Sequence, residues 1–202
     1  MGTEEPTRVR MSAAERREQL LDVTKDIVGD QGFHAVSIEA VARRAGITRP
    51  VVYGHFQDLG SLLEAMVDRE GQRALTQLAT ILPTDLAVSD PRETLLAALR
   101  GYLEAVRADP VTWRLVLMPP EGAPERLRSQ IAEGREAVVA ALAQVVGPGI
   151  VPGLASPDPS LTARMLSTLS DESARLMLTD PEHYPIERLL AHARWLLDLL
   201  AS

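Results

Sequence analysis

The chain has 202 residues, of which 46% are hydrophobic and 24% are charged, and its formal net charge is −7 at pH 7. This balance permits a hydrophobic core and excludes an intrinsically disordered chain, while the negative charge argues against indiscriminate nucleic-acid binding. The absence of cysteine excludes disulfides and thiolate metal sites and fits a reducing compartment. No apolar run approaches the roughly 18 residues of a membrane-spanning helix, and the polar start does not resemble a signal peptide. We therefore expect a cytoplasmic protein with no membrane partner.

Residues 1–11 are polar and charged, and we expect them to form a flexible arm. The first helix is predicted over Ala13–Asp30, where apolar residues recur at intervals of three and four on one face. Gly32 ends this helix, because glycine accepts the backbone conformations that close a helix. Phe33 is expected to pack beneath the segment that follows. The residues predicted to be buried on the first helix are Leu20, Leu21, Thr24, Ile27 and Val28.

Residues 37–56 have the pattern of two short helices joined by a glycine turn. Ser37 is placed to cap the first of them, although Ala40 three residues on leaves the capping box incomplete. Gly46 then ends that helix. This helix-turn-helix pattern is typical of proteins that place a helix in the DNA major groove. The apolar residues that share one face of the first short helix are Ile38, Val41, Ala42 and Ala45.

The second short helix is predicted to bury one side and present the other to DNA. Thr48 is its candidate N-cap, and Pro50 suits the first helical turn because its missing N–H would have no partner there. Val52 and Phe56, four residues apart, are expected to face inward. The side chains left facing outward are Arg49, Val51, Tyr53 and His55.

The chemistry of the outward side chains suits a DNA contact. Arg49 can bond a guanine edge bidentately, and Val51 can contact a thymine methyl group. The Tyr53 hydroxyl and the His55 ring can donate to phosphate oxygens, which sets register without reading sequence. Taken singly, each is more often a solvated or core side chain, so the prediction depends on the arrangement as a unit. The complete set of predicted DNA-binding residues is Ser37, Arg44, Thr48, Arg49, Pro50, Val51, Tyr53 and His55.

Residues 12–62 resemble the DNA-binding domain of the TetR family of bacterial transcriptional regulators. The resemblance implies a three-helix DNA-binding domain, a helical ligand-binding body, a homodimer, and repression that a ligand lifts. Two positions depart from the family pattern: Gly54 stands where a basic or bulky residue is common, and Leu59-Gly60 replaces a frequent Lys-Glu pair. A lysine contact with phosphate is therefore absent. The residues that carry the resemblance are Gly32-Phe33, Ser37-Ile38, Val41-Ala42, Ala45-Gly46-Ile47-Thr48, Tyr53-Gly54-His55-Phe56 and Leu62-Leu63.

The remaining chain is predicted to be helical throughout. A long helix from about Asp58 to Leu82 would link the two parts of the protein, and proline or glycine punctuates the rest. No alternating apolar run is long enough to suggest a sheet, so the predicted fold is all-α with about nine helices. Residues 12–60 would form the helix-turn-helix domain and residues 61–202 the effector-binding and dimerisation domain. The last five helices are predicted over Pro91–Ala108, Pro110–Met118, Pro124–Val146, Pro157–Leu178 and Pro185–Ala201.

The last two predicted helices carry large apolar side chains that suit a twofold interface between copies of the chain. The family resemblance strengthens this interpretation. The alternative is that the same side chains fill the core of the body. The predicted interface residues are Leu161, Met165, Leu169, Leu189, Trp195, Leu196 and Leu200.

Aromatic residues make up only 3% of the chain, and two of them fall in consecutive helices that, by resemblance, line an effector pocket. Small-molecule sites are mostly apolar with a few polar groups, so we expect a hydrophobic or aromatic effector with one or two hydrogen bonds. The alternative is a regulator without a small-molecule effector, whose body serves dimerisation or docks a partner. The predicted ligand-binding residues are Tyr102, Trp113, Arg114, Met118 and Met177, with Asp171 and Glu172 as further polar groups.

The sequence has no pattern typical of a metal site, a cofactor or catalysis. The four histidines show no metal-ligand spacing, and there is no phosphate loop, dinucleotide fingerprint or nucleophile motif. No isolated pair of carboxylates in an apolar setting suggests a general acid and base. We therefore expect no metal, no cofactor and no enzymatic activity, with a double-stranded DNA operator as the macromolecular partner.

Overall fold

The computed structural model describes residues 11–81, 91–119, 125–147 and 156–200, leaving out the side chains of Pro91 and Leu200. Within these ranges the chain forms nine α-helices and one short 3-10 helix, and no strand. The all-α prediction is thus confirmed. The chain divides into two compact units, one ending at Met66 and the other beginning at Val67. This division falls inside a helix, six residues beyond the predicted boundary at residue 60.

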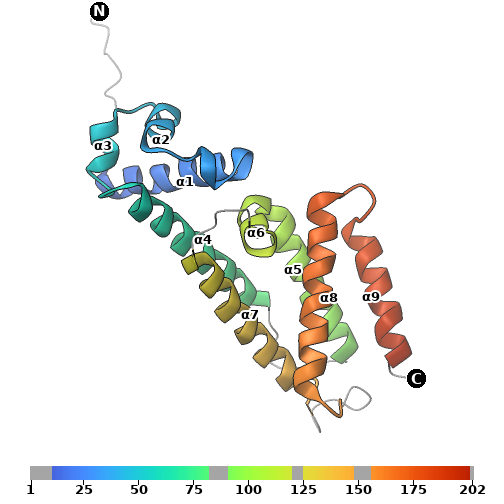
Figure 1. Ribbon diagram of the computed structural model, residues 1–202. Helices are drawn as coiled ribbons and strands as arrows, with labels where there is room; N and C mark the ends of the chain where they lie inside the picture. The colour runs from blue at the N-terminus through green and yellow to red at the C-terminus, as the bar shows by residue number, and fades with distance from the viewer. Residues whose placement is uncertain (1–10, 82–90, 120–124, 148–155, 201–202) are drawn as a thin grey trace, which may run out of the picture. The chain divides into compact units, whose positions relative to one another are not determined.

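The N-terminal unit holds α1 (Ala13–Gln31), η1 (Phe33–Ala35), α2 (Ile38–Ala45), α3 (Arg49–Tyr53) and the start of α4 (Leu59–Ile81) (Figure 1). Helix α1 begins with a full capping box: the Ser12 hydroxyl accepts from the Glu15 N–H, and the Glu15 carboxylate accepts from the Ser12 N–H at 2.7 Å. Its buried face contains all five predicted residues. The apolar residues at the centre of this unit are Leu20, Val41, Val52, Phe56, Leu62 and Met66.

The two short helices begin at Ser37 and Thr48, as their sequence pattern predicts. The Ser37 hydroxyl accepts from the Ala40 N–H at 3.0 Å. Thr48 has the extended backbone of an N-cap, but its side chain makes no capping hydrogen bond. Asp58 precedes α4 and accepts from the Ser61 N–H at 2.7 Å, which caps the helix that continues into the next unit.

The C-terminal unit contains the rest of α4 together with α5 (Pro91–Ala108), α6 (Pro110–Leu117), α7 (Glu125–Val145), α8 (Pro159–Thr179) and α9 (Ile186–Leu200). Helix α5 packs against α6, α8 and α9, and α7 packs against α8 (Figure 1). The core of the unit gathers around Leu103, Val106 and Trp113, which are almost fully buried. Helix α8 begins at Pro159, two residues after its predicted start, because Asp158 accepts from the Leu161 N–H and caps it.

Candidate DNA-binding surface and ligand cavity

The turn between α2 and α3 is closed by backbone hydrogen bonds around Gly46. Gly46 has φ +66°, in the left-handed region that glycine adopts without a steric penalty. The Ile47 N–H donates to the Ala42 carbonyl at 3.0 Å, which satisfies a carbonyl at the end of α2. This closure sets α3 against α2, and Val52 anchors it with no exposed surface.

The opposite side of α3 is open to solvent. Val51 is 40% exposed and Tyr53 is 48% exposed, although both are large hydrophobic residues. Arg49 and Pro50, at the start of the helix, are also exposed. A short helix with one buried valine and an exposed Arg, Val and Tyr presents the donor and the apolar contact that base readout uses.

Two other predicted DNA contacts are engaged within the protein. The Arg44 guanidinium forms an ion pair with Asp30 at 2.8 Å, so α2 is tied to α1. His55 lies beyond the end of α3 and is half-buried, and its carbonyl accepts from Arg17 at 3.1 Å. The Arg17 guanidinium also lies 4.4 Å from the centre of the Phe56 ring. Arg17 was not predicted from the sequence, because only the fold brings α1 beside residues 55–56.

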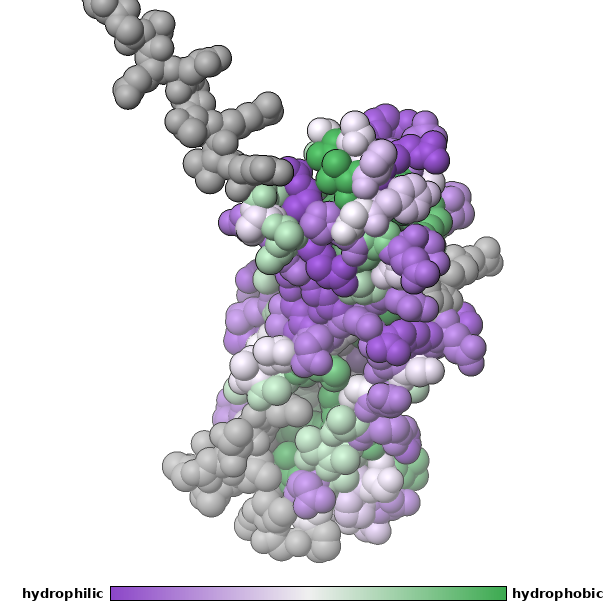
Figure 2. Space-filling view, turned by 90° about the vertical axis from the view of Figure 1, so that its left-hand side faces the viewer, coloured by the Kyte–Doolittle hydropathy of each residue, from purple (hydrophilic) through white to green (hydrophobic). Residues whose placement is uncertain are grey.

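The C-terminal unit contains a partly open cavity of about 540 Å³, lined by residues of all six of its helices. Its wall is mostly leucine, with isoleucine, valine and alanine. On the face shown in Figure 2, apolar residues (green) gather in the lower part, below a band of polar residues (purple). The volume lies within the range of small-molecule sites, and an apolar wall with few polar groups is their usual form.

Tyr102 and Trp113 meet in the wall of this cavity. Their rings pack edge to face with centres 5.1 Å apart, which is a favourable arrangement for two aromatic rings. The Trp113 indole N–H donates to Gln77 Oε1 at 3.0 Å, and the Tyr102 hydroxyl donates to Asp171 at 3.2 Å. Burial and, secondarily, the negative charge of Asp171 raise the pKa of Tyr102 well above its usual value. The phenol therefore stays protonated near neutral pH.

Asp171 is the centre of the polar part of the cavity wall. Besides the Tyr102 hydroxyl, it accepts from Arg135 at 3.0 Å, and Arg175 lies 4.0 Å away. The Asp171 side chain is 17% exposed, whereas that of Arg135 is 44% exposed. The carboxylate is thus held inside the unit by one phenol and by cations nearer to solvent.

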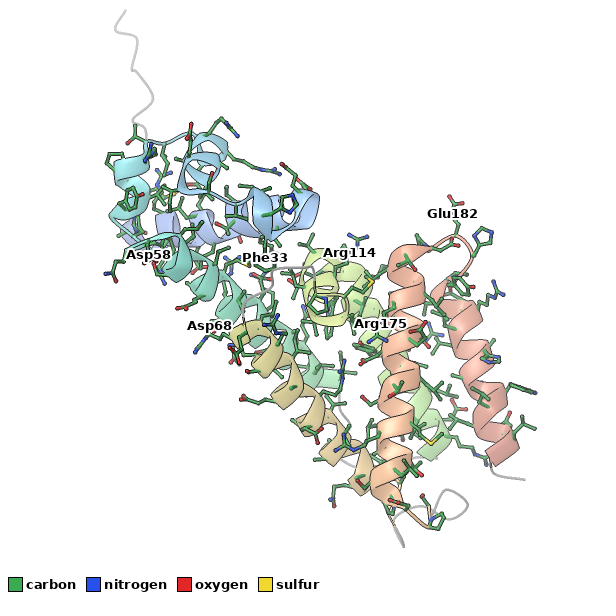
Figure 3. The ribbon with its side chains drawn as sticks, viewed as in Figure 1. Phe33, Asp58, Asp68, Arg114, Arg175 and Glu182 are labelled. Carbon is green, nitrogen blue, oxygen red and sulfur yellow. The ribbon has the colours of Figure 1, made fainter. Side chains whose placement is uncertain are left out.

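Three predicted ligand residues do not line the cavity. Arg114 is exposed, and its guanidinium donates to the Leu178 carbonyl (Figure 3). Met177 belongs to the hydrophobic core, and Met118 packs against that core after the end of α6. Arg114 and Met118 follow Trp113 in the chain, but they lie off the face of α6 that turns toward the cavity. Met177 is on another helix, α8.

A buried carboxylate on α4 was not predicted. Glu70 is 1% exposed and pairs with Arg69 at 2.8 Å and with Arg73 at 3.6 Å. It also accepts a short hydrogen bond from the hydroxyl of Thr112, which in turn bonds Asp109 at the start of α6. The sequence did contain a signal, because Glu70 lies four residues from both Met66 and Ala74, on the buried face of α4.

The predicted interface residues divide between surface and interior. Leu161, Met165 and Leu169 are each more than half exposed on α8, at intervals of four residues, and Trp195 is 53% exposed on α9. Leu189 instead is buried in the hydrophobic core, in agreement with the alternative that these side chains fill the core of the body. Leu196 is partly buried and lines the cavity, and the side chain of Leu200 lies outside the described residues.

Metal sites and membrane-spanning helices are both absent from the part of the chain that the structure describes. In those ranges, no group of three or more His, Asp or Glu side chains is arranged to hold a metal ion. None of the described helices has the length and hydropathy needed to cross a membrane.

The chain is similar in sequence to known regulators. Residues 20–66 match the family model of bacterial regulatory proteins of the tetR family. The transcriptional activator FasR of Mycolicibacterium smegmatis is 27% identical over 179 residues, which cover 89% of this chain and 78% of FasR. The transcriptional regulator BetI of Yersinia pestis is 33% identical over 93 residues, 44% of each chain.

Solved structures share the whole fold. A TetR-like regulator from a Rhodococcus species superposes with a TM-score of 0.71 at 25% identity, over 95% of this chain and 96% of that one. FadR of Bacillus subtilis, solved in complex with stearoyl-CoA, has a TM-score of 0.64 at 16% identity over 92% and 97%. These relatives are DNA-binding regulators rather than enzymes. With its helix-turn-helix, its helical C-terminal unit and these relatives, the chain is a member of the TetR family of transcriptional regulators.

Proposed function

We propose that this regulator represses transcription in the cytoplasm by binding a near-palindromic operator as a homodimer, and that a small, mostly apolar effector releases it. The observation that carries the proposal is the apolar cavity of about 540 Å³ in the C-terminal unit. A regulator whose body served only dimerisation or docking would have no need of such a space, because protein interiors are otherwise closely packed.

On the DNA side, the proposal assigns base readout to Arg49 and Val51 and phosphate contact to Tyr53. Their exposure on α3, opposite the buried Val52, supports this assignment. In a twofold dimer the two α3 helices would reach half-sites about 34–36 Å apart, one turn of DNA. Ser37, Thr48 and Pro50 contribute by starting the two helices, and Arg44 by joining α2 to α1.

On the effector side, α4 gives a route between the two functions. One helix carries Leu62 and Met66, which are buried in the N-terminal unit, and Ala74 and Leu78, which line the cavity. An effector changes DNA affinity only if it binds one conformation of the protein better than another. We propose that cavity occupancy displaces α4 and thereby changes the position of α3 relative to the operator.

The relatives bear on the effector and on the sign of regulation. FadR of Bacillus subtilis shares the fold and was solved with stearoyl-CoA, so a body of this architecture accommodates a ligand with a long apolar chain. FasR is named an activator, and activation is therefore the second candidate. A reporter gene carrying the operator distinguishes them, because deleting a repressor raises expression and deleting an activator lowers it.

The dimer is proposed to form through the exposed apolar faces of α8 and α9. Leu161, Met165 and Leu169 form a stripe along α8, and Trp195 and Leu199 lie one turn apart on α9, each more than half exposed. Exposed leucine, methionine and tryptophan in contiguous stripes are typical of protein interfaces.

The first test is selection of random DNA duplexes on the purified protein at two salt concentrations, with Arg49→Ala and Tyr53→Ala in parallel. We expect one near-palindromic site. Arg49→Ala should relax the preference at one base position per half-site and cost about 1–3 kcal/mol, since a bidentate arginine–guanine pair contributes about that much. Tyr53→Ala should weaken all duplexes similarly, because phosphate contacts do not read sequence.

Glu104→Gln serves as the control for handling and charge, because Glu104 is an exposed residue of α5 in the other unit. Failure of the parent protein to enrich any site would overturn operator binding. An enriched site that Arg49→Ala leaves unchanged would instead remove Arg49 from base readout while the regulator function stands.

A further inference from the structure

Several hydrogen-bond donors in the cavity wall are already bonded to protein acceptors. Tyr102 donates to Asp171, and Trp113 donates to Gln77. The amide nitrogen of Gln130 donates to Asp68 at 2.6 Å, an orientation that the carboxylate dictates because it only accepts. The hydroxyls of two serines on α8 donate to carbonyls of their own helix, and these are Ser170 and Ser173.

The acceptors of the wall, in contrast, keep unused capacity. Gln130 Oε1 is enclosed over Gly71 and accepts no hydrogen bond from the described residues. A carboxylate has about four acceptor positions, and Asp171 uses two of them for Tyr102 and Arg135. The Tyr102 oxygen also keeps its lone pairs once its hydrogen is donated. The Ser167 hydroxyl can donate or accept and therefore does not discriminate between ligands.

We propose that the effector is an apolar molecule with a hydrogen-bond donor group, a hydroxyl or an N–H, that bonds Asp171 beside Tyr102, and that ligands with only acceptor groups are disfavoured. This inference rests on the proposed effector cavity and adds the chemical class of its ligand. A molecule ending in a carboxylate or an ether would place its oxygen against other acceptors.

The surroundings of Asp171 strengthen this selectivity. The Tyr102 hydroxyl is protonated near neutral pH, as tyrosine ordinarily is, and burial and the nearby charge raise its pKa further, so its hydrogen remains available to Asp171. Glu172, the next residue, also lines the cavity, but its side chain is 56% exposed and pairs with Arg175 at 3.2 Å, so it adds little negative charge at Asp171. Arg135 and His192 also line the cavity and can offer N–H groups, but the Arg135 side chain is 44% exposed and His192 is exposed, so solvent screens both.

The test uses three ligands with an unbranched ten-carbon chain: 1-decanol, decyl methyl ether and decanoate. Their dissociation constants are measured by calorimetry for the parent protein, for Asp171→Asn and for Glu104→Gln. The ether keeps the oxygen of the alcohol and replaces its donor hydrogen by a methyl group. Asp171→Asn keeps the size of the side chain but replaces one acceptor oxygen by an N–H donor. Glu104→Gln removes the same charge on α5 outside the cavity.

We expect the parent protein to bind decanol about tenfold or more tightly than either other ligand, since a hydrogen bond to a charged group is worth that ratio or more. Asp171→Asn should reduce the preference to about threefold or less, and Glu104→Gln should leave it unchanged. Binding of the three ligands with equal affinity would overturn the donor requirement while the effector cavity stands. Absence of binding by all three would overturn the proposed effector cavity and this inference with it.

Discussion

At the scale of single residues, Glu70 shows how burial changes the role of a common side chain. A glutamate on a helix is usually solvated, but here 1% of its surface is exposed and two arginines and a threonine surround it. Its charge offsets that of Arg69, whose side chain is 15% exposed. Removing one partner of a buried ion pair leaves the other charge in a poorly solvated place.

Glu70→Gln is therefore expected to lower the free energy of unfolding by about 3 kcal/mol. Urea denaturation followed by circular dichroism measures the change, provided that the slope with urea is unaltered. The control is Glu104→Gln, whose pair with Arg100 is 3.9 Å long and about half exposed, and which should cost less than about 0.5 kcal/mol. Equal losses for the two variants would show that burial gives the Glu70 charge no special weight.

The direction in which a single side chain points was not predictable from the sequence. Tyr102 and Trp113 were predicted at a ligand site and line the cavity, whereas Arg114 is the neighbour of Trp113 and faces away from it. Adjacent residues of a helix are about 100° apart, so the type of residue does not specify its direction. Leu189 was predicted at an interface and lies in the core, because a leucine-rich helix has an inner and an outer face and composition alone does not distinguish them.

At the scale of elements, the helices were predictable because local chemistry starts and ends them. Asp-Pro sequences begin α6 and α8, with Asp109 and Asp158 as caps, and Gly32 and Gly46 end α1 and α2. Observed helix ends that fall in the described ranges differ from the predicted ends by at most two residues. The 3-10 turn at Phe33–Ala35 was not predicted, since three residues carry no periodic pattern.

The turn of the helix-turn-helix gives a prediction at this scale. Gly46 has φ +66°, and a Cβ built on it would meet no atom within 4 Å, so substitution costs backbone strain without a steric clash. Gly46→Ala is expected to lower the unfolding free energy by about 1–2 kcal/mol. Gly46→Asn should cost less, because asparagine tolerates the left-handed region better than alanine does.

Thermal unfolding checks this, with Gly60→Ala as the matched control. Gly60 lies in the first turn of α4, where an added Cβ makes only ordinary contact with Asp58, so alanine should be neutral or stabilise by up to about 1 kcal/mol. If Gly46→Ala stabilised the protein as Gly60→Ala does, the turn would not depend on the left-handed conformation.

At the scale of the whole molecule, the chain separates its two functions into two units that share one helix. The N-terminal unit leaves polar and apolar side chains of α3 exposed, and the C-terminal unit contains a cavity and leaves apolar stripes on α8 and α9. The division lies six residues beyond the boundary that the helix-turn-helix pattern predicts. The cavity was not derivable from residue types, because its walls are ordinary core leucines.

The proposed dimer gives the prediction that involves the complete molecule. Met165 is 60% exposed in the middle of the α8 stripe, and Trp195 is 53% exposed on α9. A glutamate at either position would bring a carboxylate into an apolar interface, which costs several kcal/mol unless the charge is paired. Met165→Glu and Trp195→Glu are therefore expected to give monomers, and to lose operator binding because one recognition helix contacts only one half-site.

Sedimentation equilibrium measures the mass of each variant, and a gel-shift titration measures its operator affinity. Ala132→Glu is the control, because it adds the same charge at an exposed position of another helix, α7. Circular dichroism must show that each variant keeps its helices, so that loss of the dimer is separated from loss of the fold. If both variants remain dimers, the interface lies elsewhere. If they are monomers that still bind the operator with full affinity, α8 and α9 hold the dimer but do not set the spacing of the two α3 helices.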